Sequence, residues 1–188
     1  MIENNWITLV KPNKVDYKIS DNKKFGTVVI EPLEKGFGTT LGNALRRVLL
    51  SSLQGTAITS IKINGVLHEF STIEGVREDV TDIIMNLKNV TFNSKSNHTQ
   101  KLSLNVKGPK EVLSSDFDEN HEVEIVDKDT VIMNVDSNRE VNLEIFLDVN
   151  KGYISAEKNK DNESKSVGQI ILDATFSPVK RVAFNVEN

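Results

Sequence analysis

One helix-forming segment, set in a sequence whose other apolar residues mostly alternate with polar ones, constrains the possible folds most. Apolar residues recur in this segment at intervals of three and four, as they do on one face of an α-helix. Thr39 or Thr40 can cap its amino end, and Gly55 ends the run. The positions on this apolar stripe are Leu41, Ala44, Leu45, Val48 and Leu49. The pattern predicts a helix over about 40–53.

A second apolar stripe predicts another helix over 76–88. Its positions are Val76, Val80, Ile83, Ile84 and Leu87. Elsewhere apolar residues alternate or form short β-branched runs, which is typical of strands. The predicted strands are 15–19, 27–30, 58–63, 102–106, 123–125, 131–133, 141–147 and two more within 170–186, around Ser177-Pro178. Two helices and many strands, segregated rather than alternating, place the chain in the α+β class.

Two connecting segments carry predictions of their own. Asn64-Gly65 is a strong tight-turn signal, so residues 66–70 are expected to return as a strand beside 58–63. Residues 157–166 are charged, with no apolar residue to bury, and are predicted to form a loop.

Composition excludes several classes of protein. The net charge of the 188 residues is −4, whereas nucleic-acid binders usually carry a basic excess, so direct DNA contact is not expected. The chain has no cysteine, which excludes disulfides, cysteine-type zinc sites and thiol nucleophiles. No apolar run approaches the roughly 20 residues of a membrane span, and the amino end lacks a secretory pattern. We therefore expect a cytoplasmic location and no membrane association.

Motifs for catalysis or cofactor binding are weak. His68, His98 and His121 lie far apart in the sequence and have no cysteine with which to share a metal, so neither a metal nor another cofactor is expected. No Gly-x-Ser-x-Gly elbow is present, and no catalytic residue is predicted.

Two segments leave an alternative open. Gly36-Phe37-Gly38 opens the first helix and could cradle a phosphate in a stand-alone enzyme, but no Gly-Lys-Ser/Thr follows it. A sharp turn from strand to helix is the simpler interpretation. Asp116, Asp118 and Glu119 could bind a cation, but they lack the spacing of an EF-hand, and a solvated turn is favoured.

On a helical wheel the apolar residues of the first helix cluster on one side, and this side is expected to pack in the core, at Leu41, Ala44, Leu45 and Val48. The helix also has a face opposite this core stripe. At 100° per residue this face carries Asn43, Arg46, Arg47 and Leu50. Arginine beside an apolar anchor is frequent at the centre of protein interfaces, so the face is a candidate contact patch. A singly exposed leucine is equally compatible with a solvated face. The residues alone leave both interpretations open.

The segment 33–90, LEKGFGTTLGNALRRVLLSSLQGTAITSIKINGVLHEFSTIEGVREDVTDIIMNLKNV, resembles the central region of the bacterial-type DNA-directed RNA polymerase α subunit, in its amino-terminal assembly domain. FSPVKRVAFNVE near the end, and LVKPNKVDY and VVIEPL near the start, are similar to the same family. The likeness is weakest over roughly 93–160. It implies an α+β fold in two parts: a discontinuous dimerisation subdomain, 1–54 plus 177–188, and an inserted β-rich subdomain, 55–176, that contacts the large subunits.

The resemblance also implies a function and site residues. The family member is a non-catalytic scaffold that dimerises and gathers the β and β′ subunits, which hold the nucleotidyltransferase active site. Arg47 and Leu50 match positions that contact β, with Arg46 and Asn43 beside them. Lys88 and Leu172 match positions associated with β′. His68 and Glu69 fall near the large-subunit interface, although a structural turn is equally compatible there.

The family continues beyond the position of Asn188. It has a further helix that completes the dimer interface, and then a linker and a separate domain that contacts promoter DNA. The resemblance therefore implies a homodimer weakened by the lack of this final helix, and no direct DNA contact by the present region.

Overall fold

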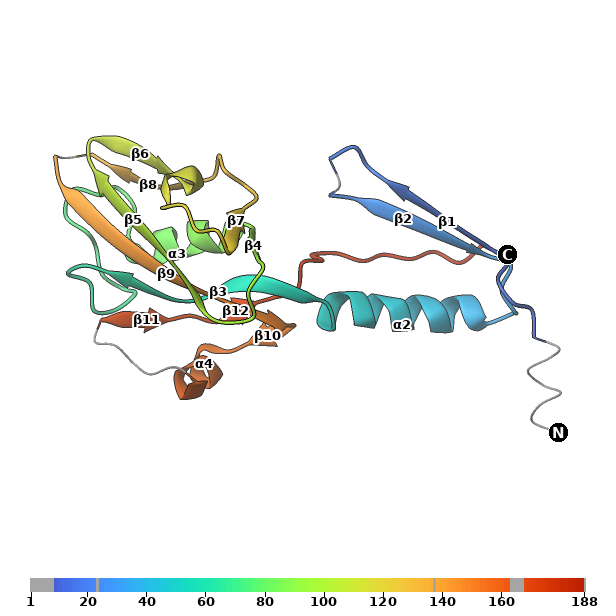
Figure 1. Ribbon diagram of the computed structural model, residues 1–188. Coiled ribbons are helices and arrows are strands. Elements are labelled where there is room, and N and C mark those ends of the chain that lie inside the picture. The colour runs from blue at the N-terminus through green and yellow to red at the C-terminus, as the bar shows by residue number, and fades with distance from the viewer. Residues whose placement is uncertain (1–8, 23, 137, 163–167, 188) are drawn as a thin grey trace. The chain divides into compact units, whose positions relative to one another are not determined.

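A computed structural model describes residues 9–22, 24–136, 138–162 and 168–187 (Figure 1). The chain divides into two compact units, Met1–Val48 with Arg181–Asn188 and Leu49–Lys180. Among the described residues, strands outnumber helices, of which three are α-helices, and this is compatible with the predicted α+β class.

The first unit contains an antiparallel hairpin of β1 (Lys14–Ile19) and β2 (Gly26–Glu31), as the alternation at 15–19 and 27–30 predicts. Cross-strand register places five apolar side chains on one face: Val15, Tyr17, Ile19, Val28 and Ile30. The opposite face carries the ion pairs of Lys14 with Asp16 and Glu31, at 3.0 and 2.9 Å.

Helix α2 (Phe37–Ser51) follows the hairpin and confirms the first predicted helix, although it begins three residues earlier. Gly36 has a φ of +87°, a conformation that costs glycine little, and Phe37 N donates to Glu34 O at 3.0 Å. This is the sharp turn into the helix that the glycines predicted.

The second unit is built on a four-stranded antiparallel sheet of order β11-β3-β9-β5 (Figure 1). Its strands are β3 (Gln54–Ile63), β5 (Gln100–Lys107), β9 (Glu140–Lys151) and β11 (Gln169–Ile171). Buried residues alternate with half-buried or exposed ones along β5 and β9, as predicted. Three two-stranded ladders complete the unit: β4 (Phe92–Ser94) with β7 (Val123–Ile125), β6 (Lys110–Leu113) with β8 (Val131–Val135), and β10 (Tyr153–Ile154) with β12 (Ala174–Thr175).

The core of the second unit lies between the sheet, β8 and helix α3 (Val80–Asn89). The predicted stripe of α3 is buried, at Val80, Ile83, Ile84 and Leu87. The helix begins four residues later than predicted, because the Asp79 side chain caps it by accepting from Asp82 N at 2.7 Å. Val76 matches the helical spacing but lies in extended chain, where it bridges to Val135.

Residues 66–70 do not form the predicted return strand. The turn at Asn64-Gly65 does form, and Gly65 has a φ of +80°. However, β9 and β11 already pair with the two edges of β3, so no edge is left for a returning strand.

Two predictions near the carboxyl end are also wrong. Residues 157–162 belong to helix α4 (Ala156–Asn162) and not to a loop. The buried Asn159 of this helix donates to Leu172 O at 2.8 Å. The rest of the predicted loop, residues 163–166, lies outside the described residues. Within the described residues after Thr175, no second strand follows Ser177-Pro178. This segment packs against α2 instead of pairing in a sheet.

Candidate partner-binding surfaces

The face of α2 that carries the candidate β contacts is exposed for three of its four residues. Asn43, Arg46 and Arg47 are exposed, as the helical wheel predicts. Leu50 is half-buried, so it is not the singly exposed leucine that the wheel allowed. The side chain retains enough surface to contact a partner, but it also contributes to packing within the chain.

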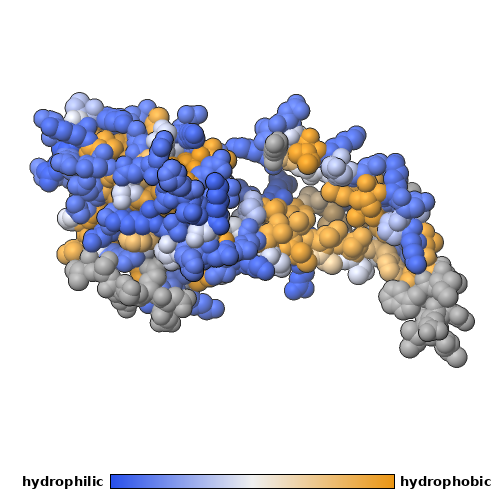
Figure 2. Space-filling model, in the orientation of Figure 1, coloured by the Kyte–Doolittle hydropathy of each residue, from blue (hydrophilic) through white to orange (hydrophobic). Residues whose placement is uncertain are grey.

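The apolar stripe of α2 is not part of the core of this chain. No residue of α2 is buried, and Leu45 and Val48 are 41% and 51% exposed. Figure 2 shows apolar residues gathered over the unit that contains α2. The interpretation of Leu41, Ala44, Leu45 and Val48 as a core stripe is therefore wrong. Periodicity identifies an apolar face, but it does not identify what covers that face.

One edge of α2 is covered by the carboxyl-terminal segment of the same unit. A Cβ atom added at Gly42 would lie 2.4 Å from the Phe184 ring, and one added at Gly38 would lie 2.8 Å from Val186 Cγ1. Glycine is required for so close an approach. Val186 thus lies against the Gly38 that a phosphate cradle would need, so this face of Gly38 is not open to a ligand.

The candidate β′ residues Lys88 and Leu172 are brought together by the fold of the second unit. Lys88 Nζ forms an ion pair with Asp173 Oδ1 at 2.5 Å, next to Leu172 in the chain. Leu172 itself is buried, and its backbone N donates to Thr59 O at 2.8 Å. The ion pair of Lys88 and Asp173 therefore reaches the surface, whereas the Leu172 side chain is buried and anchors the chain next to Asp173.

The segment that contains His68 and Glu69 lies at the start of the exposed face of α3. Glu69 O accepts from Thr81 Oγ1 at 3.0 Å, and His68 Nδ1 lies 3.1 Å from Ser71 Oγ. His68 and Glu69 therefore adjoin the helix that carries Lys88.

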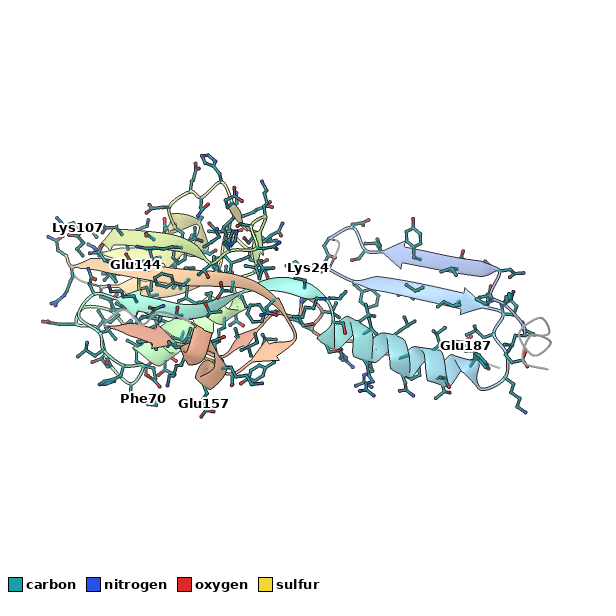
Figure 3. All side chains as sticks on the ribbon, turned by 60° about the horizontal axis from the view of Figure 1, so that its bottom comes forward. Lys24, Phe70, Lys107, Glu144, Glu157 and Glu187 are labelled. Atoms are coloured by element: carbon teal, nitrogen blue, oxygen red, sulfur yellow. The ribbon has the colours of Figure 1, made fainter. Side chains whose placement is uncertain are left out.

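Two apolar residues on this face had not been selected from the sequence. Phe70 is 82% exposed at the surface of the second unit (Figure 3), and Met85 is exposed on α3, one turn from both Thr81 and Lys88. The sequence did contain a signal for Met85. It is an apolar residue of the predicted helix that lies outside the apolar stripe of Ile83 and Leu87, so an exposed position could have been expected for it. We define the α3 surface as His68, Glu69, Phe70, Met85 and Lys88.

The acidic segment 116–119 has a structural role. Asp116 accepts hydrogen bonds from Lys110 Nζ at 2.6 Å and from Leu113 N at 3.0 Å. Partial burial acts to raise the pKa of this carboxyl, but these two bonds and the Lys110 charge together hold the pKa below its usual value. Asp118 N donates to Ser103 O at 2.9 Å, which covers the edge of β5. Asp118 and Glu119 are exposed, as the favoured solvated turn implies, whereas Asp116 is half-buried and bonded within the chain.

Among the described residues, no group of three or more histidine, aspartate or glutamate side chains is arranged to hold a metal ion. In the same residues, no helix is both long enough and apolar enough to cross a membrane.

Residues 61–177 match the RNA polymerase Rpb3/RpoA insert domain. This range takes in α3, β5, β9 and Lys88 with its partner Asp173, and it covers more than half of the chain. The chain belongs to this family of RNA polymerase subunits. It is an α-type subunit in its amino-terminal region, a component of the enzyme that transcribes DNA, as the resemblance in the sequence implied. The hairpin and α2 lie outside the matched range.

Proposed function

We propose that this α-type subunit is a non-catalytic assembly scaffold of DNA-directed RNA polymerase. Two copies associate, and then one copy binds β and the other binds β′. Residues 1–54 with 177–188 carry self-association and, on one face of α2, the contact with β, whereas the inserted residues 55–176 carry large-subunit binding through the contact with β′. The observation that supports the proposal most is the family match over 61–177, on the unit that presents the α3 surface.

Self-association is assigned to the exposed apolar stripe of α2. The carboxyl-terminal segment covers one edge of α2 but leaves none of its residues buried, and contiguous exposed apolar surface marks a protein interface. Val48→Glu should lower the dimer fraction in sedimentation velocity over a dilution series. Asn43→Glu, which adds the same charge on the opposite face, should leave the dimer fraction unchanged. A wild-type chain that stays monomeric at all concentrations would remove dimerisation from the proposal.

Binding of β is assigned to Arg47, with Asn43, Arg46 and Leu50 beside it. Truncation of a desolvated arginine anchor typically costs about 2–5 kcal/mol of binding free energy. Arg47→Ala should therefore release β in a pull-down at physiological salt while the fold is retained. Lys35→Ala removes an exposed charge just before α2 and is the matched control. Full retention of β by Arg47→Ala would exclude Arg47 from the contact.

Binding of β′ is assigned to Lys88, with Leu172 acting through its neighbour Asp173. His68 and Glu69 extend the contact toward the start of α3. Lys88→Ala should weaken retention of β′, whereas Lys101→Ala, which breaks a comparable surface ion pair with Glu144 at 2.5 Å, should not. Equal retention by the two variants would exclude Lys88.

A further inference from the structure

The segment that leads into α3 pairs with one edge of β8. Val76 forms an antiparallel bridge with Val135, and Arg77 N donates to Asn134 O at 3.0 Å. The other edge of β8 is paired with β6. The segment therefore contacts this edge of β8 through an isolated antiparallel bridge, which pairs backbone groups that would otherwise be left unpaired.

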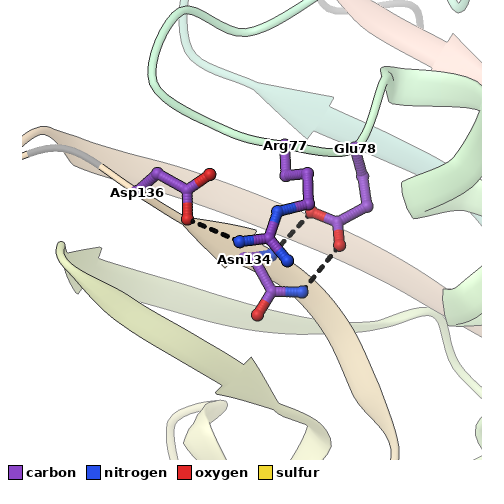
Figure 4. Close-up of polar contacts among 4 residues, drawn as sticks. All are labelled: Arg77, Glu78, Asn134 and Asp136. Carbon is purple, nitrogen blue, oxygen red and sulfur yellow. Dashed lines mark hydrogen bonds and ion pairs between the residues drawn. The ribbon is translucent and has the colours of Figure 1, made fainter.

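Glu78 completes this edge with its side chain. Its Oε2 accepts from the backbone N of Asn134 at 2.6 Å, and its Oε1 accepts from Asn134 Nδ2 at 2.8 Å (Figure 4). One carboxylate thus binds two donors of one residue. Hydrogen bonds to an ionised acceptor are roughly twice as strong as neutral ones.

The other charged contacts of the segment are more exposed. Arg77 pairs with Asp136 at 3.1 Å, and Arg139 pairs with Glu74 at 2.6 Å, but the side chains of both pairs are at least half exposed. Exposed ion pairs contribute little to stability. Glu78 is half-buried, so its bonds to Asn134 are the stronger link between the segment and β8.

Glu78 also lies two residues before the first residue of α3, Val80. The neighbouring Asp79 caps the helix, and Val80 N donates to Ser71 O at 3.1 Å. Thr81 Oγ1 in turn donates a hydrogen bond to Glu69 O at 3.0 Å. The start of α3 and the segment of His68, Glu69 and Phe70 are therefore tied to the same short stretch of chain.

We propose that Glu78 is a positioning residue, which fixes the α3 surface against β8 so that it is preformed for its partner. A preformed surface loses less conformational entropy on binding than a mobile one. The identity of the partner, a large polymerase subunit, rests on the proposed function. The positioning is a property of this chain alone and can be measured without the partner.

Hydrogen exchange on the isolated chain tests the positioning. Glu78→Ala should make the amides of residues 75–84 exchange about ten- to a hundredfold faster, while the amides of β5 and β9 keep their wild-type rates. The double variant Glu78→Gln with Asn134→Asp exchanges the carboxylate and the amide across the pair. It should restore slow exchange, because the new amide oxygen accepts from the backbone N and the new carboxylate accepts from the amide nitrogen. Glu74→Ala, in the same segment, is the control and should change nothing.

Reconstitution with the polymerase large subunits supplies the second measurement. Glu78→Ala should release its large subunit about tenfold faster than wild type, and the exchanged pair should restore slow release. Unchanged exchange at 75–84, or equal acceleration in β5 and β9, would overturn the positioning role, as would failure of the exchanged pair to restore either measurement. If exchange responds as expected but the wild-type chain retains no large subunit, the positioning is supported and the proposed function is wrong.

Discussion

Gly55→Ala tests a close backbone approach in the second unit. Gly55 pairs with Asn150 near the start of β3, and the Phe176 carbonyl passes so near that an added Cβ would lie 2.0 Å from its oxygen. Phe176 is buried, and its N donates to Gly152 O at 2.8 Å. The obstacle is therefore a hydrogen-bonded backbone, which cannot move aside by changing a rotamer.

The magnitude follows from this geometry. Cβ atoms essentially never lie within 3.0 Å of another heavy atom, so the two backbones must separate by roughly 1 Å. Overpacking typically costs about 1–3 kcal/mol, and more where backbone must shift. We expect a loss of about 3 kcal/mol or more in the free energy of unfolding, which for a chain of this size is a fall of roughly 10 °C in Tm.

Gly65→Ala is the control for this substitution. Gly65 has a positive φ of +80°, but nothing lies within 4 Å of its added Cβ, so the change introduces backbone strain without a clash. The strain should cost only about 1 kcal/mol. Urea and thermal unfolding of both variants measure the difference. A loss at Gly55 no larger than that at Gly65 would refute the steric argument.

Three further substitutions have defined outcomes. Leu45→Ala should cost under about 1 kcal/mol, because Leu45 is already 41% exposed and its removal leaves no closed cavity. Ile83 is fully buried, so Ile83→Ala should cost roughly 2–5 kcal/mol, and equal urea midpoints for the two variants would contradict this. Asn159→Ala leaves the buried Leu172 carbonyl without its donor and should cost about 1–3 kcal/mol in the same assay; a neutral effect would contradict the role of α4 in holding this segment. The pKa of Asp116 is lowered by folding, so its contribution to stability is present above the unfolded pKa and is lost as pH falls through the folded one. Asp116→Asn should therefore flatten the decline of stability as pH falls below about 4, and an unchanged acid slope in urea midpoints would contradict this.

Local periodicity was sufficient to predict the elements of the second unit that bury one face. The alternation in 102–106 and 141–147 gave β5 and β9, and four of the five stripe residues before Asn89 are buried on α3. Each of these elements packs against its own chain, so an apolar face and a buried face coincide. For α2 they do not coincide, which is why the same reasoning failed for Leu45 and Val48.

Long-range pairing could not be predicted from local pattern. Lys88 and Asp173 are 85 residues apart, and nothing near either residue indicates the other. The return strand after Gly65 failed for a related reason, since the edges of β3 are occupied by strands from distant parts of the sequence. For Lys88 and Leu172, the resemblance to a family indicated a shared role, and the fold shows how an ion pair and a buried leucine occupy adjoining positions.

The exposed apolar surface of the first unit has a consequence for its stability. Every residue of β1 is exposed, and α2 has no buried residue, whereas a two-stranded hairpin is only marginally stable in water without a packing partner. If association of two copies covers this surface, mass action stabilises the first unit as protein concentration rises. The second unit has its own core and should not respond. We therefore expect slower hydrogen exchange in β1, β2 and α2 at high concentration and unchanged exchange in β5 and β9. Val48→Glu should abolish this dependence, and equal exchange at both concentrations in the wild-type chain would show that self-association does not stabilise the first unit.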